Sequence, residues 1–193
     1  MKVLPSSPII KPLKFWDLVK HQTVISHFQH EQYEPVVDDD KAYFLSVQKV
    51  ANEWPVTCLP DVSSFCPHEM CSVLRRIRER WGVNSARVSI WAEHNILDSE
   101  GILEAARLAF DEEFSILAVA PLDWSCCIRL SEIGVAAVEV QAAIPEIESA
   151  IQRRSLLQKI VADAHTDVWF GGNVVHEDLE FAISVGSAGI CIP

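Results

Sequence analysis

Lysine is missing from a long central stretch of this 193-residue sequence: no position from Val50 to Gln158 carries it. A Schiff base needs a primary amine that can lose its proton, and arginine, which stays charged in proteins, cannot replace it. The sequence also lacks any apolar run near the roughly 18 residues that span a bilayer, and its cationic residues form no long run. These absences argue against Schiff-base chemistry in this stretch and against a membrane partner.

The charge further limits the classes of partner. The formal net charge is −11, and 49% of the residues are hydrophobic, which is enough for one domain with a sizeable core. Such an acidic chain is a poor partner for nucleic acid or an anionic membrane, so we predict neither. Residues 1–14 alternate proline with lysine and contain no signal-peptide core, and we expect a cytoplasmic protein. The six cysteines fit buried thiols in a reducing compartment.

From residue 41 onward, helical and extended patterns alternate in regular order. Residues 1–40 show no such order, so we divide the chain into an irregular N-terminal segment, 1–40, and a single domain, 41–193. Apolar positions three and four apart, with capping residues such as Asp98 and Asp123, predict helices over 40–51, 67–81, 98–110, 123–133, 145–164 and 177–185. Short apolar runs predict strands over 56–59, 87–91, 114–120, 135–140, 168–170 and 189–192.

Strands that follow helices without hairpin signals imply a parallel sheet joined by right-handed crossovers. We therefore predict an α/β fold of the (β/α) TIM-barrel-like type, with an open doubly wound sheet as the alternative. Because the sequence stops at the last predicted strand, no final outer helix follows it. We expect a barrel that is incomplete or open at its C-terminal end.

In a barrel of parallel strands, function lies at the carboxyl ends of the strands. The polar residues predicted there are Asp61, Glu93, His94, Asp123, Glu139, Gln141 and Asn173. Glu139 and Gln141 are two positions apart in one strand and therefore share one of its faces. Two interpretations stay open: the pair closes the barrel core through a hydrogen bond, or Glu139 is a catalytic carboxylate. Glu93 and Asp123 are the further candidates for catalysis.

Gly171, Gly172 and Asn173 end a predicted strand and lead into a predicted helix. Unobstructed backbone amides next to a helix N-terminus can hold a phosphate group, so we predict phosphate binding here, with a simple tight turn as the alternative. Cys66 and Cys71 have no second ligand pair at zinc-finger spacing. We predict no metal and no cofactor.

From about Leu59 to the end, the order of elements and several patches resemble bacterial thiazole synthase, the barrel enzyme that builds the thiazole phosphate of thiamine from a pentulose phosphate. The patches are Leu59-Pro60-Asp61, Ile102 to Ala106, Phe114 to Leu117, Arg129 to Val138 and Gly172 to Ile190. A weaker similarity extends to transaldolases and ketodeoxyphosphogluconate aldolases. The resemblance implies a phosphorylated small molecule as ligand and, for an active protein, lyase- or transferase-type chemistry on a sugar phosphate.

The sequence departs from this family at the residues that carry its chemistry, which leaves the catalytic status open. The family's Schiff-base lysine corresponds here to Arg87 or, with a shift in register, to Ser89, and Phe170 stands where the family has an acid. The first hypothesis is therefore a divergent barrel that binds a phosphorylated sugar. The alternatives are a pseudoenzyme that acts as a scaffold for a protein partner or a homo-oligomer, and an aldolase-like enzyme.

Overall fold

The computed structural model describes residues 2–5, 22–29, 56–92, 96–141, 150–172 and 176–192. The strands in these ranges are β1 (Lys2–Pro5), β2 (Gln22–Gln29), β3 (Val56–Ser64), β4 (Ser85–Ile90), β5 (Ser115–Pro121), β6 (Ala137–Gln141), β7 (Asp167–Gly171) and β8 (Gly189–Ile192). The helices are α2 (Pro67–Trp81), α3 (Ser99–Asp111), α4 (Trp124–Ile133), α5 (Ala150–Asp163) and α6 (His176–Ser184). From β3 onward strand and helix alternate, as the sequence predicts.

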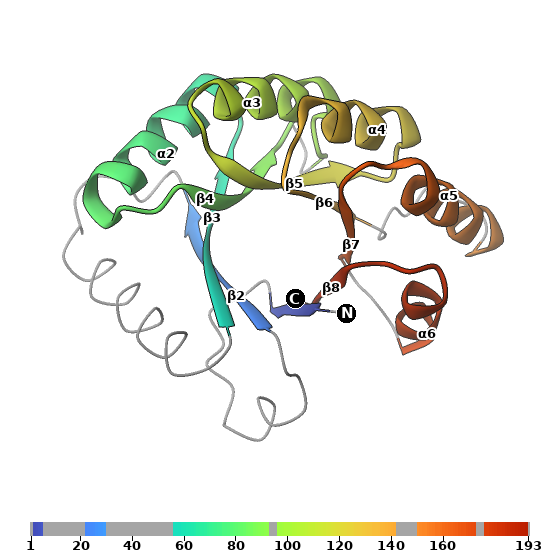
Figure 1. Cartoon of the computed structure of the whole chain (residues 1–193). Helices are drawn as coiled ribbons and strands as arrows, with labels where there is room; N and C mark the ends of the chain where they lie inside the picture. Colours follow the sequence, from blue (N-terminus) through green and yellow to red (C-terminus); the bar gives the residue numbers. More distant parts are fainter. Residues whose placement is uncertain are drawn as a thin grey trace.

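The described strands run parallel and form a closed barrel in the order β1 to β8. The predicted TIM-barrel-like α/β fold is therefore confirmed. The sequence analysis expected an incomplete or open C-terminal end; in the structure β8 pairs with β1, with Lys2 opposite Gly189, so both ends of the chain lie side by side (Figure 1). β1 and β2 lie within 1–40, which the sequence analysis left irregular. Within the described ranges no helix follows β8.

Capping residues place the helix ends where the sequence predicts them. α2 begins at Pro67, whose fixed φ suits the first turn, and stops at Gly82 with a left-handed φ of 68°. Asp98 caps α3 by accepting hydrogen bonds from two backbone N–H groups of the first turn. α4 ends at Gly134, which has a φ of 93°. These local signals fix where each helix begins and ends, and therefore where in the sequence the next strand can begin.

Successive residues of a strand point to opposite faces of the sheet, and this alternation gives the barrel two apolar clusters. The outward-facing residues Val62, Val88 and Val138 belong to the large cluster between the strands and the helices. The small cluster faces the barrel axis and consists of Leu117, Ala137, Trp169 and Cys191, with Leu59 and Ala188 partly buried beside it. Polar side chains occupy other positions on the inward face, so the barrel interior is where a site is expected.

β3 is longer than predicted, and its length changes the position of Asp61. The predicted strand stops at residue 59, where the apolar run ends. β3 nevertheless runs to Ser64, and Asp61 pairs in register with Arg87 of β4. Asp61 therefore lies within a strand. The predicted helix over 40–51 lies outside the described residues.

Candidate functional site

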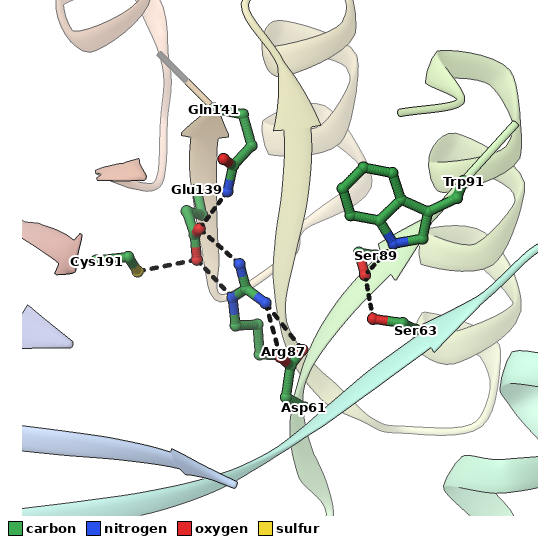
Figure 2. Close-up of polar contacts among 8 residues, drawn as sticks. All are labelled: Asp61, Ser63, Arg87, Ser89, Trp91, Glu139, Gln141 and Cys191. Atoms are coloured by element: carbon green, nitrogen blue, oxygen red, sulfur yellow. Dashed lines mark hydrogen bonds and ion pairs between the residues drawn. The ribbon is translucent and has the colours of Figure 1, made fainter. Parts of the chain in front are cut away.

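Three strands bring one arginine and two carboxylates together inside the barrel (Figure 2). Arg87 of β4 donates from Nε and Nη2 to the two carboxylate oxygens of Glu139 of β6, both at 2.7 Å. Its Nη1 donates to both oxygens of Asp61 of β3, each at 2.9 Å. Arg87 is 8% exposed, Glu139 0% and Asp61 1%. We call these three residues the charged layer.

The charged layer fixes the protonation state of Arg87. Burial alone would lower the pKa of its guanidinium, but the nearby carboxylates of Glu139 and Asp61 outweigh burial and raise it well above its ordinary value. Arg87 thus occupies an inward-facing strand position as a permanently charged residue, and the sequence from β3 to β8 offers no lysine within a strand. Imine formation on these strands is excluded.

Glu139 accepts hydrogen bonds from two further side chains. Gln141 Nε2 donates to its Oε1 at 2.7 Å, and the Cys191 thiol of β8 donates to its Oε2 at 2.9 Å. Burial, followed by the nearby charge of Glu139, raises the pKa of Cys191 well above its ordinary value, so this thiol stays protonated. The hydrogen-bonded pair of Glu139 and Gln141 is confirmed. A catalytic role for Glu139 stays a prediction.

A second polar group lies toward the carboxyl ends of β3 and β4. Ser63 and Ser89 follow Asp61 and Arg87 by two residues and therefore face the same interior. Their hydroxyl oxygens are 2.7 Å apart, and the indole Nε1 of Trp91 donates to Ser89 Oγ at 3.1 Å (Figure 2). We call Ser63, Ser89 and Trp91 the mouth cluster. It lies on the side of the barrel at which parallel barrels carry their sites.

The character of the interior changes along the strands. From Leu59 onward, the inward-facing residues of β3 are Leu59, Asp61 and Ser63. Those of β6 are Ala137, Glu139 and Gln141. Along these stretches both strands present an apolar residue, then a carboxylate of the charged layer, and then a neutral hydrogen-bonding group. The interior lined by these residues therefore becomes polar toward the carboxyl ends of the strands.

The predicted phosphate turn begins directly beside the charged layer. Gly171 ends β7, and a Cβ added to it would lie 2.3 Å from Glu139 Oε1 and 2.9 Å from Gln141 Nε2, so glycine alone fits there. Gly172 follows with a φ of 90°, a conformation that favours glycine. Asn173 lies outside the described residues. The structure thus brings Gly171 and Gly172 to the carboxyl end of the barrel, and phosphate binding there stays a prediction.

The other two predicted catalytic residues are not part of this arrangement. Asp123 is exposed, and its Oδ1 accepts hydrogen bonds from the backbone N–H groups of Ser125 at 2.7 Å and Cys126 at 3.2 Å. This capping of α4 accounts for an acid at position 123. Glu93 lies outside the described residues. Of the described catalytic candidates, Glu139 is the one that belongs to the charged layer.

The sequence analysis did not predict that Arg87 pairs with Glu139 and Asp61, nor that Ser63 contacts Ser89. It treated Arg87 only as the replacement for a lysine. The usable signal was a spacing of two, because polar residues two positions apart lie in or directly after three predicted strands: Asp61 with Ser63, Arg87 with Ser89, and Glu139 with Gln141. Such pairs in otherwise apolar strands indicate a polar barrel interior.

Three buried cysteines are poor nucleophiles. Burial raises the pKa of Cys71 to about 11 and that of Cys126 to about 12, and it raises the pKa of Cys127 further. All three therefore remain thiols near neutral pH. In the ranges that the structure describes, no cluster of three or more His, Cys, Asp or Glu side chains is placed to hold a metal. No described helix combines the length and the apolar character needed to cross a membrane.

No family model matches the sequence, and no curated protein matches it either. Solved structures, in contrast, share its fold. A chain of the BexX/CysO complex from Amycolatopsis orientalis superposes with a TM-score of 0.71 at 15% identity, over 99% of this chain and 78% of that chain. The tryptophan synthase A-subunit from Pyrococcus furiosus gives 0.60 at 12% identity, over 99% and 84%. The YdjI aldolase from Escherichia coli K12 gives 0.59 at 16% identity, over 89% and 65%.

These similarities and the fold define the class of protein. The chain is an α/β protein of the TIM-barrel-like type, and its structural neighbours include an aldolase. At identities of 12% to 16% the neighbours show the fold alone, since one barrel architecture supports many activities. The particular resemblance to bacterial thiazole synthase therefore belongs to the proposal that follows.

Proposed function

We propose that this barrel binds a phosphorylated sugar, or a related small molecule, at the carboxyl ends of its strands and without a Schiff base. The observation that carries the proposal is the change inside β3 and β6 from apolar to charged to neutral polar residues toward the mouth. Buried polar groups cost free energy unless they are hydrogen-bonded. A mouth lined by serine hydroxyls and a glutamine amide therefore suits a polar ligand better than a purely structural core.

The phosphate group is assigned to the turn Gly171, Gly172 and Asn173. A Cβ added to Gly171 would lie 2.3 Å from Glu139 Oε1, so this carboxylate lies beside the turn, and a bare carboxylate there would repel an anion. Arg87 donates two hydrogen bonds of 2.7 Å to Glu139, which weakens this repulsion. α6 begins at His176, and the N-terminus of a helix favours a negative charge. These features support an anion at the turn, on the β7 side of the mouth.

In this proposal the chain is a divergent relative of bacterial thiazole synthase that has exchanged its imine-forming lysine for Arg87. The same exchange disfavours a transaldolase-like or imine-forming aldolase mechanism. Catalysis by a lyase-type reaction would have to use Glu139 or Glu93 for proton transfer, and four donors already surround the two oxygens of Glu139. Ligand binding is therefore the central claim. Turnover that survives Glu139→Gln unchanged would rule out Glu139 as the proton carrier.

Thermal unfolding with inorganic phosphate and a panel of pentose and hexose phosphates tests the binding. A ligand at a hundred times its Kd stabilises the folded state by about 2.7 kcal/mol. Gly172→Val should abolish the response, whereas Gly186→Val is the matched control. Gly186 also has a left-handed φ, 79°, with no atom within 4 Å of an added Cβ. No stabilisation by any sugar phosphate, or a response that survives Gly172→Val, would contradict the proposal.

Exposed apolar side chains favour a second candidate, a non-catalytic scaffold that binds a protein partner or a second copy of the chain. Phe65 is 66% exposed and Ile96 is 61% exposed, and they follow β3 and β4 on the mouth side of the barrel. Analytical ultracentrifugation of Phe65→Ser/Ile96→Ser tests this role, with Ile183→Ser as a control at an exposed position on α6. If the wild type and Ile183→Ser assemble and Phe65→Ser/Ile96→Ser does not, the result would favour the scaffold. A wild-type monomer would exclude the homo-oligomer.

A further inference from the structure

We propose that the neutral, hydroxylated end of the ligand binds against the mouth cluster of Ser63, Ser89 and Trp91. This assignment extends the proposed function, from which it takes the class of ligand, a phosphorylated sugar. Its own evidence is the hydrogen bonding of the cluster, which is independent of the phosphate turn. β3 and β4 lie on the left of the barrel in Figure 1 and β7 on the right, so the ligand would span the mouth.

One hydroxyl proton of the mouth cluster has no acceptor. Ser63 and Ser89 have two hydroxyl protons, and only one of them can lie between the two oxygens at 2.7 Å. The indole N–H of Trp91 donates to Ser89 Oγ, so it takes up a lone pair of that oxygen. As a donor, this N–H cannot accept the second hydroxyl proton. Within the described part of the chain these three side chains make no other hydrogen bond. The cluster can therefore donate one hydrogen bond to a ligand oxygen.

Burial makes this unused donor significant. Ser89 is 1% exposed and Ser63 is of intermediate exposure, so the second proton is buried when it belongs to Ser89 and faces the mouth when it belongs to Ser63. Leaving a buried donor unsatisfied costs about 1–3 kcal/mol, which a ligand acceptor would recover. The residue two positions earlier in each strand belongs to the charged layer, so the donor lies directly next to it along the strands.

The charged layer selects a neutral acceptor at this position. Asp61 precedes Ser63 by two residues on the same face of β3, so its carboxylate lies next to the mouth cluster. Arg87 directs its Nε, Nη1 and Nη2 donors to Glu139 and Asp61 and not to the mouth. A phosphate or carboxylate at the mouth cluster would therefore approach the Asp61 carboxylate, whereas a sugar hydroxyl or carbonyl oxygen would add no negative charge there.

Trp91 adds a flat apolar surface with a fixed orientation. Its indole is held by the hydrogen bond to Ser89, its backbone pairs with Leu97 in an isolated bridge, and the residue is partly exposed. An aromatic ring beside a few convergent polar groups is the usual composition of a small-molecule site. The C–H groups of a sugar can contact such a ring while its oxygens meet the hydroxyls. The cluster thus matches the two kinds of surface that a sugar presents.

Serine-to-alanine variants test the assignment, with ribose 5-phosphate, ribose and inorganic phosphate as probes. Ser63→Ala and Ser89→Ala each leave one hydroxyl with a free proton, so each should weaken sugar binding only partly. Ser63→Ala/Ser89→Ala removes the donor and should raise the Kd for ribose 5-phosphate by about 3- to 10-fold, with the Kd for inorganic phosphate unchanged. Ser131→Ala/Ser187→Ala is the matched control, because both serines are buried and donate to backbone carbonyls elsewhere.

A second measurement uses the wild-type protein and so does not depend on whether a variant folds. The indole N–H signal of Trp91 in a ¹⁵N–¹H spectrum, assigned with Trp91→Phe, should shift saturably with ribose 5-phosphate and much less with inorganic phosphate. A Trp91 signal that stays unchanged at saturating ribose 5-phosphate would overturn the assignment. So would a Kd for the sugar phosphate that the double serine variant leaves unaltered.

The probes separate this inference from the proposed function. If ribose binds, its binding depends on Ser63 and Ser89, and inorganic phosphate does not bind, the result would support the mouth cluster and refute the phosphate turn. Phosphate and ribose 5-phosphate that bind equally well, with no dependence on the serines, would support the turn and refute the cluster. Failure of all three probes to bind would refute both.

Discussion

Replacing Arg87 by methionine should destabilise the protein strongly, because it removes the cation from the charged layer. Glu139 and Asp61 are 0% and 1% exposed, so the variant would leave two buried carboxylates without the guanidinium that donates hydrogen bonds to both. Removing one partner of a buried ion pair costs about 3–5 kcal/mol. The usual stability of a domain is about 5–15 kcal/mol. Arg87→Met should therefore lose a large fraction of the free energy of unfolding at neutral pH.

Removing the two carboxylates together with the cation should restore stability. Arg87→Met/Asp61→Asn/Glu139→Gln removes all three charges together and should recover much of the stability, since an uncharged buried group of similar size is tolerated. The matched control is Arg129→Met, which breaks an exposed pair with Glu100 on the surface of α4. Solvent screens that pair, so its loss should have little effect.

Urea unfolding followed by tryptophan fluorescence measures these differences without adding salt. The slope of the free energy against urea should stay constant, and the midpoint should fall far more for Arg87→Met than for Arg129→Met. Equal shifts for the two variants at pH 7 would refute the reasoning. A triple variant no more stable than Arg87→Met would show that lost packing, and not uncompensated charge, causes the effect.

Three further predictions concern single positions. Gly171→Ala should destabilise by about 1–3 kcal/mol, since its Cβ would lie 2.3 Å from Glu139 Oε1, and an unchanged urea midpoint would contradict this. Asp98→Ala should cost about 1 kcal/mol, because it removes the cap of α3, and a loss below a few tenths of a kcal/mol would exclude a capping role. Cys126 has a pKa of about 12, so its alkylation by iodoacetamide at pH 8 should be far slower than in urea and should accelerate as the pH rises. Similar rates in folded and unfolded protein would disprove its burial.

The helices were predictable because their signals are local. The aspartate cap at Asp98 and the glycine at Gly134 each depend on the few residues around them, and the structure places both helix ends as predicted. β1 carries no comparable signal: it has four residues and pairs with strands that are distant in sequence. Short strands of this kind are determined by the rest of the sheet.

The part of the candidate site that lies on a single strand was predictable, because alternate residues of a strand share a face. The spacing of Glu139 and Gln141 indicates a shared face, and their hydrogen bond confirms it. The partner of Glu139 could not be predicted from this spacing, because Arg87 lies 52 positions earlier in the sequence. An arginine in a strand does not by itself indicate which carboxylate it binds. Asp61 was assigned to a strand end because the apolar run stops at Leu59, whereas β3 continues through Pro60 to Ser64.

Closure of the barrel imposes an order on folding. Lys2 pairs with Gly189 and Pro5 with Ile192, so this seam joins strands that are far apart in the sequence. Pairing over such a separation has a larger entropic cost and slows folding relative to pairing between neighbouring strands. During synthesis on a ribosome β1 emerges before β8. The edges of β1 and β8 therefore stay unpaired at their common seam until residue 192 has been released, and over that interval the partly folded sheet is open to pairing with another chain.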